Sequence, residues 1–313
     1  MRGHRHQKYE RLIELAKSRP RLRTAVAHPV DEASLRGALE AADAGLIEPV
    51  LVGPEEKIRA AAMAAGLDLD GVEIVDAPHS HAAAEKAVEL VRSGAAEVLM
   101  KGSLHTDELL GAVVKRDTGL RTGRRLSHVF VMDVPDHPQT LFITDAAVNI
   151  APDLTAKRDI VQNAIDLFAG LGLGVPRVAI LSAVETVTPD IPSTIEAAAL
   201  CKMADRGQIT GGIVDGPLAF DNAISPEAAR VKGIRSEVAG AADILVVPDL
   251  EAGNMLAKNL TFLAKADAAG LVLGARAPIV LTSRADNLRT RMASCAVAVL
   301  LAHSRRATAP IAV

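Results

Sequence analysis

The segment from Ile244 to Asp286 reads ILVVPDLEAGNMLAKNLTFLAKADAAGLVLGARAPIVLTSRAD, and its pattern decides the fold. An apolar, strand-like run (Ile244–Val247) ends at Pro248-Asp249 and is followed by an Ala- and Leu-rich helical segment. A second apolar run (Ile279–Leu281) ends at Thr282-Ser283-Arg284. Open α/β sheets place their ligands where strands stop at small polar residues just before a helix. The hydroxyl and guanidinium groups at the second stop suit an anionic ligand such as phosphate.

The same pattern continues outward along the chain, as short β-branched runs that alternate with longer, Ala-rich amphipathic segments. This alternation predicts the α/β class with mostly parallel strands. Near residue 127 the pattern changes, because Ser127–Met132 and Thr140–Thr144 are strand-like runs joined by VPDHPQ, which predicts an antiparallel hairpin. Asp31 is a predicted helix N-cap, and GLGLG at 170–174 predicts a helix end rather than a nucleotide loop. The other predicted strands are Arg23–Ala27, Pro49–Val52, Val72–Val75, Glu97–Met100, Val178–Leu181 and Ile213-Val214.

Composition argues against several classes of function. The 313 residues suit one large domain or two of ordinary size. The formal net charge of -3 argues against broad binding of nucleic acids or membrane surfaces, because both require a basic face. No apolar run approaches the roughly 20 residues of a membrane span, and MRGHRHQKYERL lacks a secretory apolar core, so we expect a cytoplasmic protein. Cys201 and Cys295 lack the spacing of a disulfide framework or zinc site; we expect buried, reduced thiols and no metal site.

Ser283, Arg284 and Asp286 are the first candidate site residues. Arginine presents a planar fork that pairs bidentately with phosphate and stays charged at any working pH. Ser283 stands at a strand-to-helix junction, where its hydroxyl and nearby backbone N–H groups suit an anion, and Asp286 is a candidate general base. Ser-x-x-Asp is also the pattern of a capping box, so both residues have a structural alternative. A surface ion pair is the alternative for Arg284.

The second candidate is the loop KGSLHT at residues 101–106. Gly102 allows another backbone segment to approach closely, and Ser103, His105 and Thr106 offer hydrogen-bond donors where a helix begins. His105 suits proton transfer, since an unperturbed imidazole titrates near neutrality. The alternative is an ordinary turn between a strand and a helix, with Thr106 as the N-cap and His105 as a hydrogen-bonded turn residue.

A third group of polar residues is spread over DGPLAFDNA (215–223), EAGN (251–254) and ITDAAVNIAPDL (143–154). Asn254 stands at a helix start, where an amide either caps the helix or contacts a ligand. Lys232 and Lys258 are candidate cations for an anionic ligand, with solvated helix faces as the ordinary alternative. Asp145 and Asn149 form a further strand-end motif that has no assigned individual roles.

From Glu97 to the C-terminus, the chain resembles the phosphate acetyl/butyryltransferase family. The motifs that carry this resemblance occur in the family's order: KGSLHT, LSHVFV, ITDAAVNIAPDL, LSAVE, DGPLAFDNA, PDLEAGN and PIVLTSRAD. Within the family, LRTGRRLSHV and SRADN are more similar to the butyryltransferase branch. Residues before Glu97 match only in their general α/β pattern.

The resemblance implies both a fold and a reaction. The fold is a pair of αβα domains with mostly parallel sheets, an isocitrate/isopropylmalate dehydrogenase-like architecture and an active site in the interdomain cleft. The first domain would comprise residues 1–126 plus 273–313, and the inserted second domain residues 127–272. The reaction is the reversible transfer of a short acyl group, acetyl or butyryl, between coenzyme A and inorganic phosphate. It implies coenzyme A as a substrate, a ternary complex without metal or acyl-enzyme, no cofactor, and a homodimer.

The resemblance also implies roles for the candidate residues. Arg284 and Ser283 would hold the phosphoryl group, and the 101–106 loop would contact the acyl phosphate. Lys232 and Lys258 would meet the phosphates of coenzyme A.

Two positions depart from the acetyltransferase branch of the family. Leu110 stands near the place of an arginine, for which Arg121, Arg124 and Arg125 are candidate replacements. That branch also has its catalytic aspartate several residues beyond the Ser-Arg pair, whereas residues 287–291 contain no acid. These departures motivate an alternative, a weakly active or non-catalytic acyl-CoA-binding regulatory module on the same fold. A dehydrogenase of related fold would need a metal-binding aspartate set and a dinucleotide loop, and the sequence has neither motif.

Overall fold

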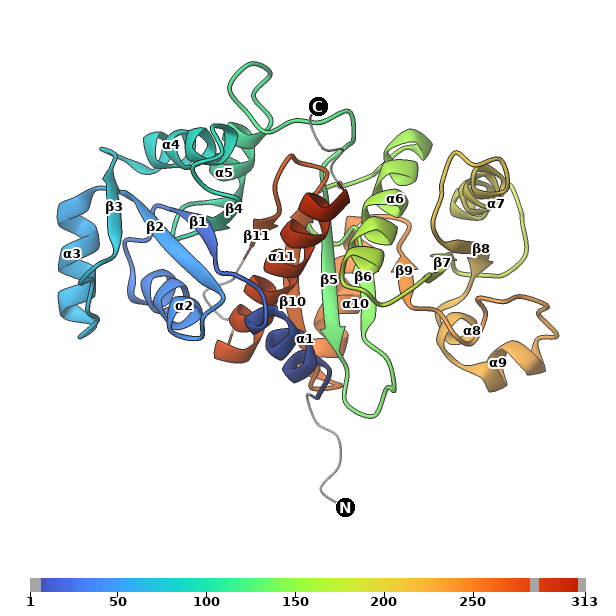
Figure 1. The fold of residues 1–313 in the computed structure, drawn as a ribbon. Coiled ribbons are helices and arrows are strands. Elements are labelled where there is room, and N and C mark those ends of the chain that lie inside the picture. Colours follow the sequence, from blue (N-terminus) through green and yellow to red (C-terminus); the bar gives the residue numbers. More distant parts are fainter. Residues whose placement is uncertain (1–6, 282–286, 309–313) are drawn as a thin grey trace. The chain divides into compact units, whose positions relative to one another are not determined.

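The computed structural model describes residues 7–281 and 287–308, which belong to two compact units (Figure 1). The terminal unit comprises Tyr9–Arg124 and Ala269–Val313, and the central unit comprises Arg125–Ala268 with Met1–Lys8. The predicted α/β class is confirmed in both units. The division into domains at residues 127 and 273 stays a proposal.

The terminal unit contains a sheet with the strand order β3-β2-β1-β4-β11-β10. From β3 to β11 the neighbouring strands run parallel, and β10 runs antiparallel to β11. Ala27 pairs with Lys101 and Val280 with Met100, so β1, β4 and β11 end at the same edge. The strands are β1 (Leu22–Ala27), β2 (Ile47–Gly53), β3 (Glu73–Asp76), β4 (Val98–Lys101), β11 (Ile279–Val280) and β10 (Asp267–Leu273), which belongs to this unit from Ala269 onward.

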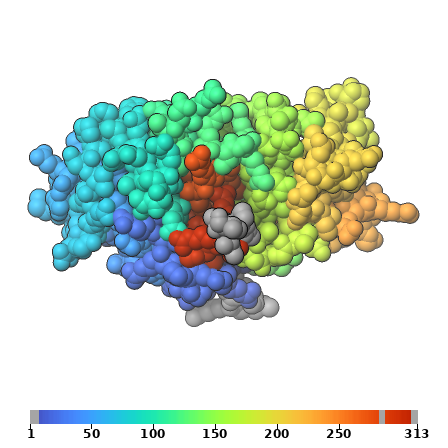
Figure 2. Space-filling view, turned by 45° about the horizontal axis from the view of Figure 1, so that its top comes forward, coloured from blue at the N-terminus to red at the C-terminus, as the bar shows by residue number. Residues whose placement is uncertain are grey.

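Helices cover both faces of this sheet. Figure 1 shows α4 and α2 on opposite sides of β1 and β2, and Figure 2, turned so that the α4 side comes forward, shows α4 and α5 covering that face. Asp31 caps α2 as predicted, because its Oδ1 accepts a hydrogen bond of 2.9 Å from the backbone N–H of Ser34. The helices are α1 (Gln7–Lys17), which belongs to this unit from Tyr9 onward, α2 (Glu32–Asp43), α3 (Glu55–Ala64), α4 (Ser80–Arg92), α5 (Thr106–Val113) and α11 (Leu288–Thr308).

The central unit has the strand order β5-β6-β9-β7-β8. β5 and β6 form the predicted antiparallel hairpin, and β6, β9, β7 and β8 run parallel. The strands are β5 (Ser127–Asp133), β6 (Leu141–Thr144), β7 (Arg177–Leu181), β8 (Ile213–Leu218) and β9 (Ile244–Val246). The helices are α6 (Leu154–Gly170), α7 (Pro192–Asp205), α8 (Phe220–Ile224), α9 (Pro226–Val231) and α10 (Leu250–Phe262).

Two predictions about strands were wrong, and both failed because tertiary pairing overrides local pattern. The sequence predicted a strand at Ile213-Val214 that stops at Asp215-Gly216-Pro217, but β8 continues through these residues to Leu218, which pairs with Leu181 of β7. Asp267–Leu273, within the segment that the sequence predicted to be helical, forms β10. Alanine and glycine are poor strand formers, but this strand is buried along nearly all its length and pairs with β11.

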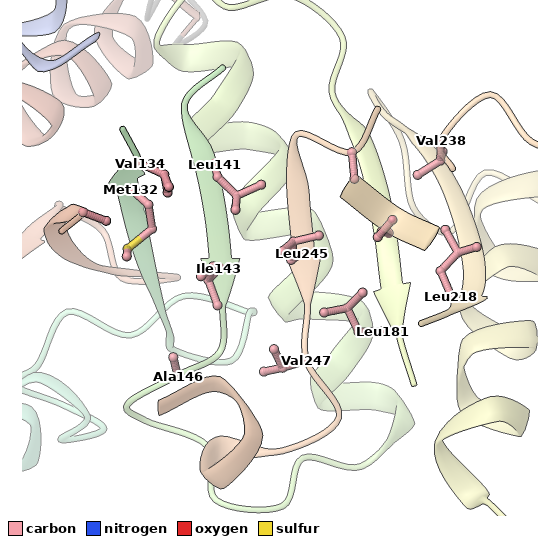
Figure 3. Packing of buried hydrophobic residues seen from close by; sticks show 14 residues of the cluster. Met132, Val134, Leu141, Ile143, Ala146, Leu181, Leu218, Val238, Leu245 and Val247 are labelled. Carbon is pink, nitrogen blue, oxygen red and sulfur yellow. The ribbon is translucent and has the colours of Figure 1, made fainter. Parts of the chain in front are cut away.

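The hydrophobic core of the central unit is built from adjacent strands (Figure 3). Met132, Ile143, Leu245 and Leu181 come from β5, β6, β9 and β7, and none of them is more than 6% exposed. Full burial of one such side chain contributes about 1.5–3 kcal/mol. This packing fixes the strands, and therefore the positions of the loops at their carboxyl ends.

Gly102 lies where the end of β4 passes close to the loop after β1. A Cβ atom at this position would lie 2.4 Å from the backbone oxygen of Ala27 and 2.8 Å from the carbonyl carbon of His28. We expect Gly102→Ala to lower the free energy of unfolding by about 1–3 kcal/mol, because backbone atoms would have to move. Urea denaturation measures this change.

Gly111→Ala in α5 is the matched control. In the described chain, no atom outside the backbone of its own helix lies within 4 Å of the Cβ that it would add. Helix propensity therefore predicts a gain of up to about 1 kcal/mol in this variant. A Gly102→Ala protein as stable as its parent would contradict the close approach of the two loops.

Candidate active site

The carboxyl edge of the terminal unit's sheet carries the predicted 101–106 loop. β1 ends at Ala27, β4 at Lys101 and β11 at Val280. Open α/β sheets bind ligands at this edge. Three predicted catalytic residues that follow β11 lie outside the described residues: Ser283, Arg284 and Asp286.

Ser103 links the loop after β4 to the loop after β1. Its hydroxyl donates a hydrogen bond of 2.7 Å to the backbone oxygen of His28 and accepts one of 3.3 Å from the backbone N–H of Val30. His28 has a φ of 55°, in the left-handed region that few non-glycine residues adopt. The hydroxyl of Ser103 therefore already has a structural role at this edge, and any contact with substrate would be additional.

His105 is the N-cap of α5, and Thr106 is the first residue of the helix. The sequence predicted Thr106 as the N-cap, and this prediction was wrong by one residue. His105 has the extended backbone (φ -70°, ψ 150°) that an N-cap requires, so it is the N-cap. The side chain of His105 makes no capping hydrogen bond and is exposed. The first backbone N–H groups of a helix have no intrahelical acceptor, and here the carboxylate of Glu108 accepts a hydrogen bond from the backbone N–H of His105. Because Asp107 and Glu108 both lie in the first turn, an anion at this helix start would have two carboxylates as neighbours.

In the central unit, a turn built on Asp145 follows the end of β6. Asp145 is 3% exposed, and its Oδ1 accepts hydrogen bonds of 3.0 Å from the backbone N–H groups of both Ala147 and Val148. Its Oδ2 accepts one of 3.2 Å from the backbone N–H of Asn149 and one of 2.5 Å from the amide Nδ2 of the same residue. Asx side chains form turns in this way, by accepting hydrogen bonds from the N–H groups that follow.

Asn149 in turn orients the guanidinium of Arg125. Oδ1 of Asn149 accepts a hydrogen bond of 2.9 Å from Nε of Arg125, and its Nδ2 also donates one of 2.8 Å to the backbone oxygen of Leu126. Arg125 is exposed, and its two terminal nitrogens have no partner among the described side chains and backbone groups. A cation is therefore held in a fixed direction at the carboxyl edge, ready to pair with an anion.

His128 lies beside this turn, because its neighbour Val129 pairs with Thr144, the residue before Asp145, in the β5–β6 ladder. It is 2% exposed, and its ring meets the ring of Phe130 edge-on at a centroid distance of 4.4 Å. Burial lowers the pKa of His128 to about 4, although the carboxylate of Asp145 acts in the opposite direction. The imidazole is therefore neutral at pH 7, and its Nδ1 has no hydrogen-bond partner in the described part of the chain.

Helix α10 packs closely against the Asp145 turn, and Figure 3 shows Ala146 of this turn. A Cβ atom on Gly253 would lie 3.0 Å from the Cα of Ala146 and 2.8 Å from a side-chain methyl of Val247, so only glycine allows this contact without a shift. The predicted Asn254 donates a hydrogen bond of 3.4 Å from Nδ2 to the backbone oxygen of Ala146. Lys258 lies one helical turn further on, is exposed and pairs with no described residue.

Lys232, at the end of α9, already has an ionic partner. Its Nζ lies 3.0 Å from Oε1 of Glu185, and Oε2 of Glu185 accepts a hydrogen bond of 3.3 Å from the buried amide of Asn222. The hydrogen bond to Glu185 raises the pKa of Lys232, and the hydrogen bond from Lys232 holds the pKa of Glu185 below its ordinary value. A phosphate at Lys232 would have to compete with this carboxylate.

The predicted residues therefore fall into separate groups. Asn254 and Lys258 lie on α10, with Asn254 bonded to the Asp145 turn, and Lys232 lies with Glu185. Ser103, His105 and Thr106 belong to the terminal unit, so their grouping with residues of the central unit stays a prediction.

Sequence reasoning left open which arginine serves the site and gave Asn149 no role. The signal that was available is an apolar strand (LFIT) followed by Asp145 and, four residues later, an asparagine. This spacing is typical of an Asx turn. The hydrogen bond to Arg125, 24 residues away, has no such local signal.

The two cysteines are free, and burial raises the pKa of each thiol, Cys201 and Cys295, to about 12. Within residues 7–281 and 287–308, no three His, Cys, Asp or Glu side chains are grouped so that they could hold a metal ion. In the described part of the chain, no helix has the length and apolar character that crossing a membrane requires.

Comparison with known proteins places this geometry in context. A family model described as phosphate acetyl/butaryl transferase matches residues 79–299. The phosphate acetyltransferase of Rhizobium meliloti is 72% identical over 306 residues, which cover 98% of this chain and 97% of that relative. The phosphate butyryltransferase of Clostridium acetobutylicum is 43% identical over 297 residues, which cover 95% of this chain and 99% of that relative.

A solved structure is also similar over most of the chain. The branched-chain phosphotransacylase from Enterococcus faecalis V583 has a TM-score of 0.80 and 31% sequence identity, and the match covers 90% of this chain and 99% of that one.

The buried His128 predicts a specific dependence of stability on pH. Its ordinary pKa of 6.5 applies to the unfolded chain, and the folded value is about 4, so between these values the unfolded chain binds a proton that the folded chain does not. The stabilisation is complete above pH 6.5 and is lost as pH falls toward 4. Between pH 7.5 and pH 5, this residue alone lowers the free energy of unfolding by about 2 kcal/mol.

Urea denaturation of the parent and of His128→Gln at pH 7.5 and pH 5 measures this contribution. The other histidines are common to both proteins and cancel in the comparison. Between pH 7.5 and pH 5, we expect the free energy of unfolding of the variant to fall by about 2 kcal/mol less than that of the parent. The same loss in both proteins would show that the folded chain does not exclude a proton from His128.

Proposed function

The chain belongs to the phosphate acetyl/butaryl transferase family, and from this premise we propose how its residues serve the reaction. The protein catalyses the reversible transfer of a short acyl group, acetyl or butyryl, between coenzyme A and inorganic phosphate. The observation that carries this conclusion is the match over nearly the whole chain to relatives named for both acyl groups. We propose that coenzyme A is a substrate and that no further cofactor takes part.

The reaction defines the groups that the protein must supply. In one direction, a phosphate oxygen attacks the carbonyl carbon of the thioester, and the C–S bond of the tetrahedral intermediate breaks to release coenzyme A as a thiolate. In the reverse direction, the thiol, with a pKa of about 8.5, loses its proton before it attacks the acyl phosphate. The protein therefore needs a cation for the phosphoryl group, donors for the oxyanion, and a base for the thiol proton.

We assign the catalytic roles to Ser283, Arg284 and Asp286. Arg284 neutralises the phosphoryl group, Ser283 donates a hydrogen bond to it, and Asp286 accepts the thiol proton. The position of β11 supports this assignment, because β11 runs parallel to β4 and ends at the edge that carries the 101–106 loop. At that loop, we assign contacts with the acyl phosphate to Ser103, His105 and Thr106. Positioning of both substrates in one ternary complex supplies the remaining acceleration.

In the central unit, we propose that Arg125 provides the cation that is absent at Leu110. Its hydrogen bond to Asn149 leaves both terminal nitrogens available for a phosphate oxygen. Asn254 and Lys258 are proposed to contact coenzyme A, with Lys258 pairing with one of its phosphates. Lys232 is a weaker candidate for the same role, because a phosphate would have to displace Glu185.

The alternative, a non-catalytic acyl-CoA-binding regulatory module, is not favoured, because relatives that match nearly the whole chain are named as enzymes. We further propose that the protein is a cytoplasmic homodimer. This proposal rests on family membership, and light scattering of the purified protein tests the dimer.

The proposed catalysis is tested by release of coenzyme A from acyl-CoA, measured with a thiol-trapping reagent over acyl groups of two to six carbons. We expect release that depends on phosphate in the parent. Arg284→Ala should lower kcat/KM for phosphate by roughly 10²-fold, because it removes a cation that stabilises charge in the transition state. Its unfolding curve in urea should match that of the parent.

Arg59→Ala is the matched control, because Arg59 forms an exposed ion pair with Glu55 on α3. This variant should keep the parent's kinetics. Unchanged kinetics in Arg284→Ala would assign Arg284 to a surface ion pair instead. A parent that releases no coenzyme A with phosphate at any chain length would refute the proposed function.

A further inference from the structure

An apolar surface lies on the Asp145 turn, at the carboxyl edge of the central unit's sheet, which is the edge where open α/β sheets bind ligands. Ile150, directly after the turn, is 75% exposed, Ala147 is also exposed, and Val148 is half-buried. The backbone N–H of Leu250 donates a hydrogen bond of 3.0 Å to the backbone oxygen of Ile150, so the start of α10 fixes the position of this residue. A large aliphatic side chain is thus exposed on a backbone that is held at both ends.

Two cations and an amide belong to the segment that leads to this turn or to α10, the helix that packs against it. Arg125 is bonded to Asn149, the residue before Ile150. Asn254 is bonded to the backbone of Ala146, and Lys258 follows one helical turn later on the same side of α10. A ligand that complements this arrangement has an apolar chain attached to anionic groups. Acyl phosphates and acyl-CoA thioesters have this chemistry.

We propose that Ile150, together with the exposed parts of Ala147 and Val148, contacts the acyl chain of the substrate and sets the preference for chain length. This inference rests on the proposed function and extends it, because it names the part of the substrate that this surface recognises. The contact grows with each methylene of the acyl group. Transfer of one methylene from water to a fully apolar contact changes affinity by about 4-fold. On an open surface such as this one, each methylene is only partly buried, so the change in affinity per methylene is smaller.

The test is a graded series, Ile150→Val and Ile150→Ala, assayed by phosphate-dependent release of coenzyme A from acetyl-, butyryl- and hexanoyl-CoA. We expect Ile150→Ala to lower the ratio of kcat/KM for butyryl-CoA to that for acetyl-CoA by about 3- to 10-fold. Ile150→Val should fall between the parent and Ile150→Ala. The value for acetyl-CoA should change by less than about 2-fold, because acetyl carries no methylene.

Val175→Ala is the matched control. Val175 is 65% exposed and precedes β7, so it lies at the opposite, amino edge of the same sheet. This variant should leave every ratio unchanged. Both positions are exposed, so the variants should remain folded, and urea denaturation verifies this.

Four outcomes would overturn the proposal. If Ile150→Ala lowered kcat/KM equally for acetyl-, butyryl- and hexanoyl-CoA, Ile150 would contact the part of the substrate that all thioesters share. A lower molecular mass of the variant in light scattering would identify the surface as a contact between two copies of the chain. A parent without phosphate-dependent release would refute the proposed function, and the chain-length proposal with it, whereas unchanged ratios in an active Ile150→Ala enzyme would refute the chain-length proposal alone.

Discussion

Asp145 accepts hydrogen bonds from three successive backbone N–H groups and from the amide of Asn149, and this buried carboxylate fixes the ligand edge of the central unit. An unpaired buried acceptor or donor costs about 1–3 kcal/mol, so removal of the carboxylate would leave several such penalties in one turn. Because the turn is held, Asn149 presents its Oδ1 to Arg125 in one direction. In the proposed site the carboxylate therefore does not contact substrate itself but helps to place the guanidinium of Arg125.

Both units bring a functional loop against a neighbouring backbone by means of a glycine. In the terminal unit, Gly102 allows the end of β4 to approach Ala27, and Ser103 then bonds to the next loop. In the central unit, Gly253 allows α10 to approach Ala146, and Asn254 then bonds to that residue. In each case the polar residue after the glycine makes the hydrogen bond, so packing and backbone hydrogen bonding account for the residue types in KGS and AGN.

The sequence predicted those features that depend on local signals. The hairpin around VPDHPQ, the N-cap at Asp31 and the helix end near Gly172 each follow from turn or capping chemistry within a few residues. β10 escaped prediction because its alanines and glycine become a strand only through pairing with β11. The same limit applied to the candidate site. Lys232 and Glu185 are 47 residues apart in the sequence, and no local pattern indicates that they form an ion pair.

The most direct measurement is a double-mutant cycle on Arg125 and Asn149, with kcat/KM for acyl-CoA and phosphate as the readout. Residues that act through one another are not additive in such a cycle. Arg125→Ala should lower kcat/KM by roughly 10²-fold, Asn149→Ala should have a smaller or similar effect, and the double variant should be no worse than Arg125→Ala. A double variant whose loss equals the product of the two single losses would contradict the role of Asn149 in orienting Arg125.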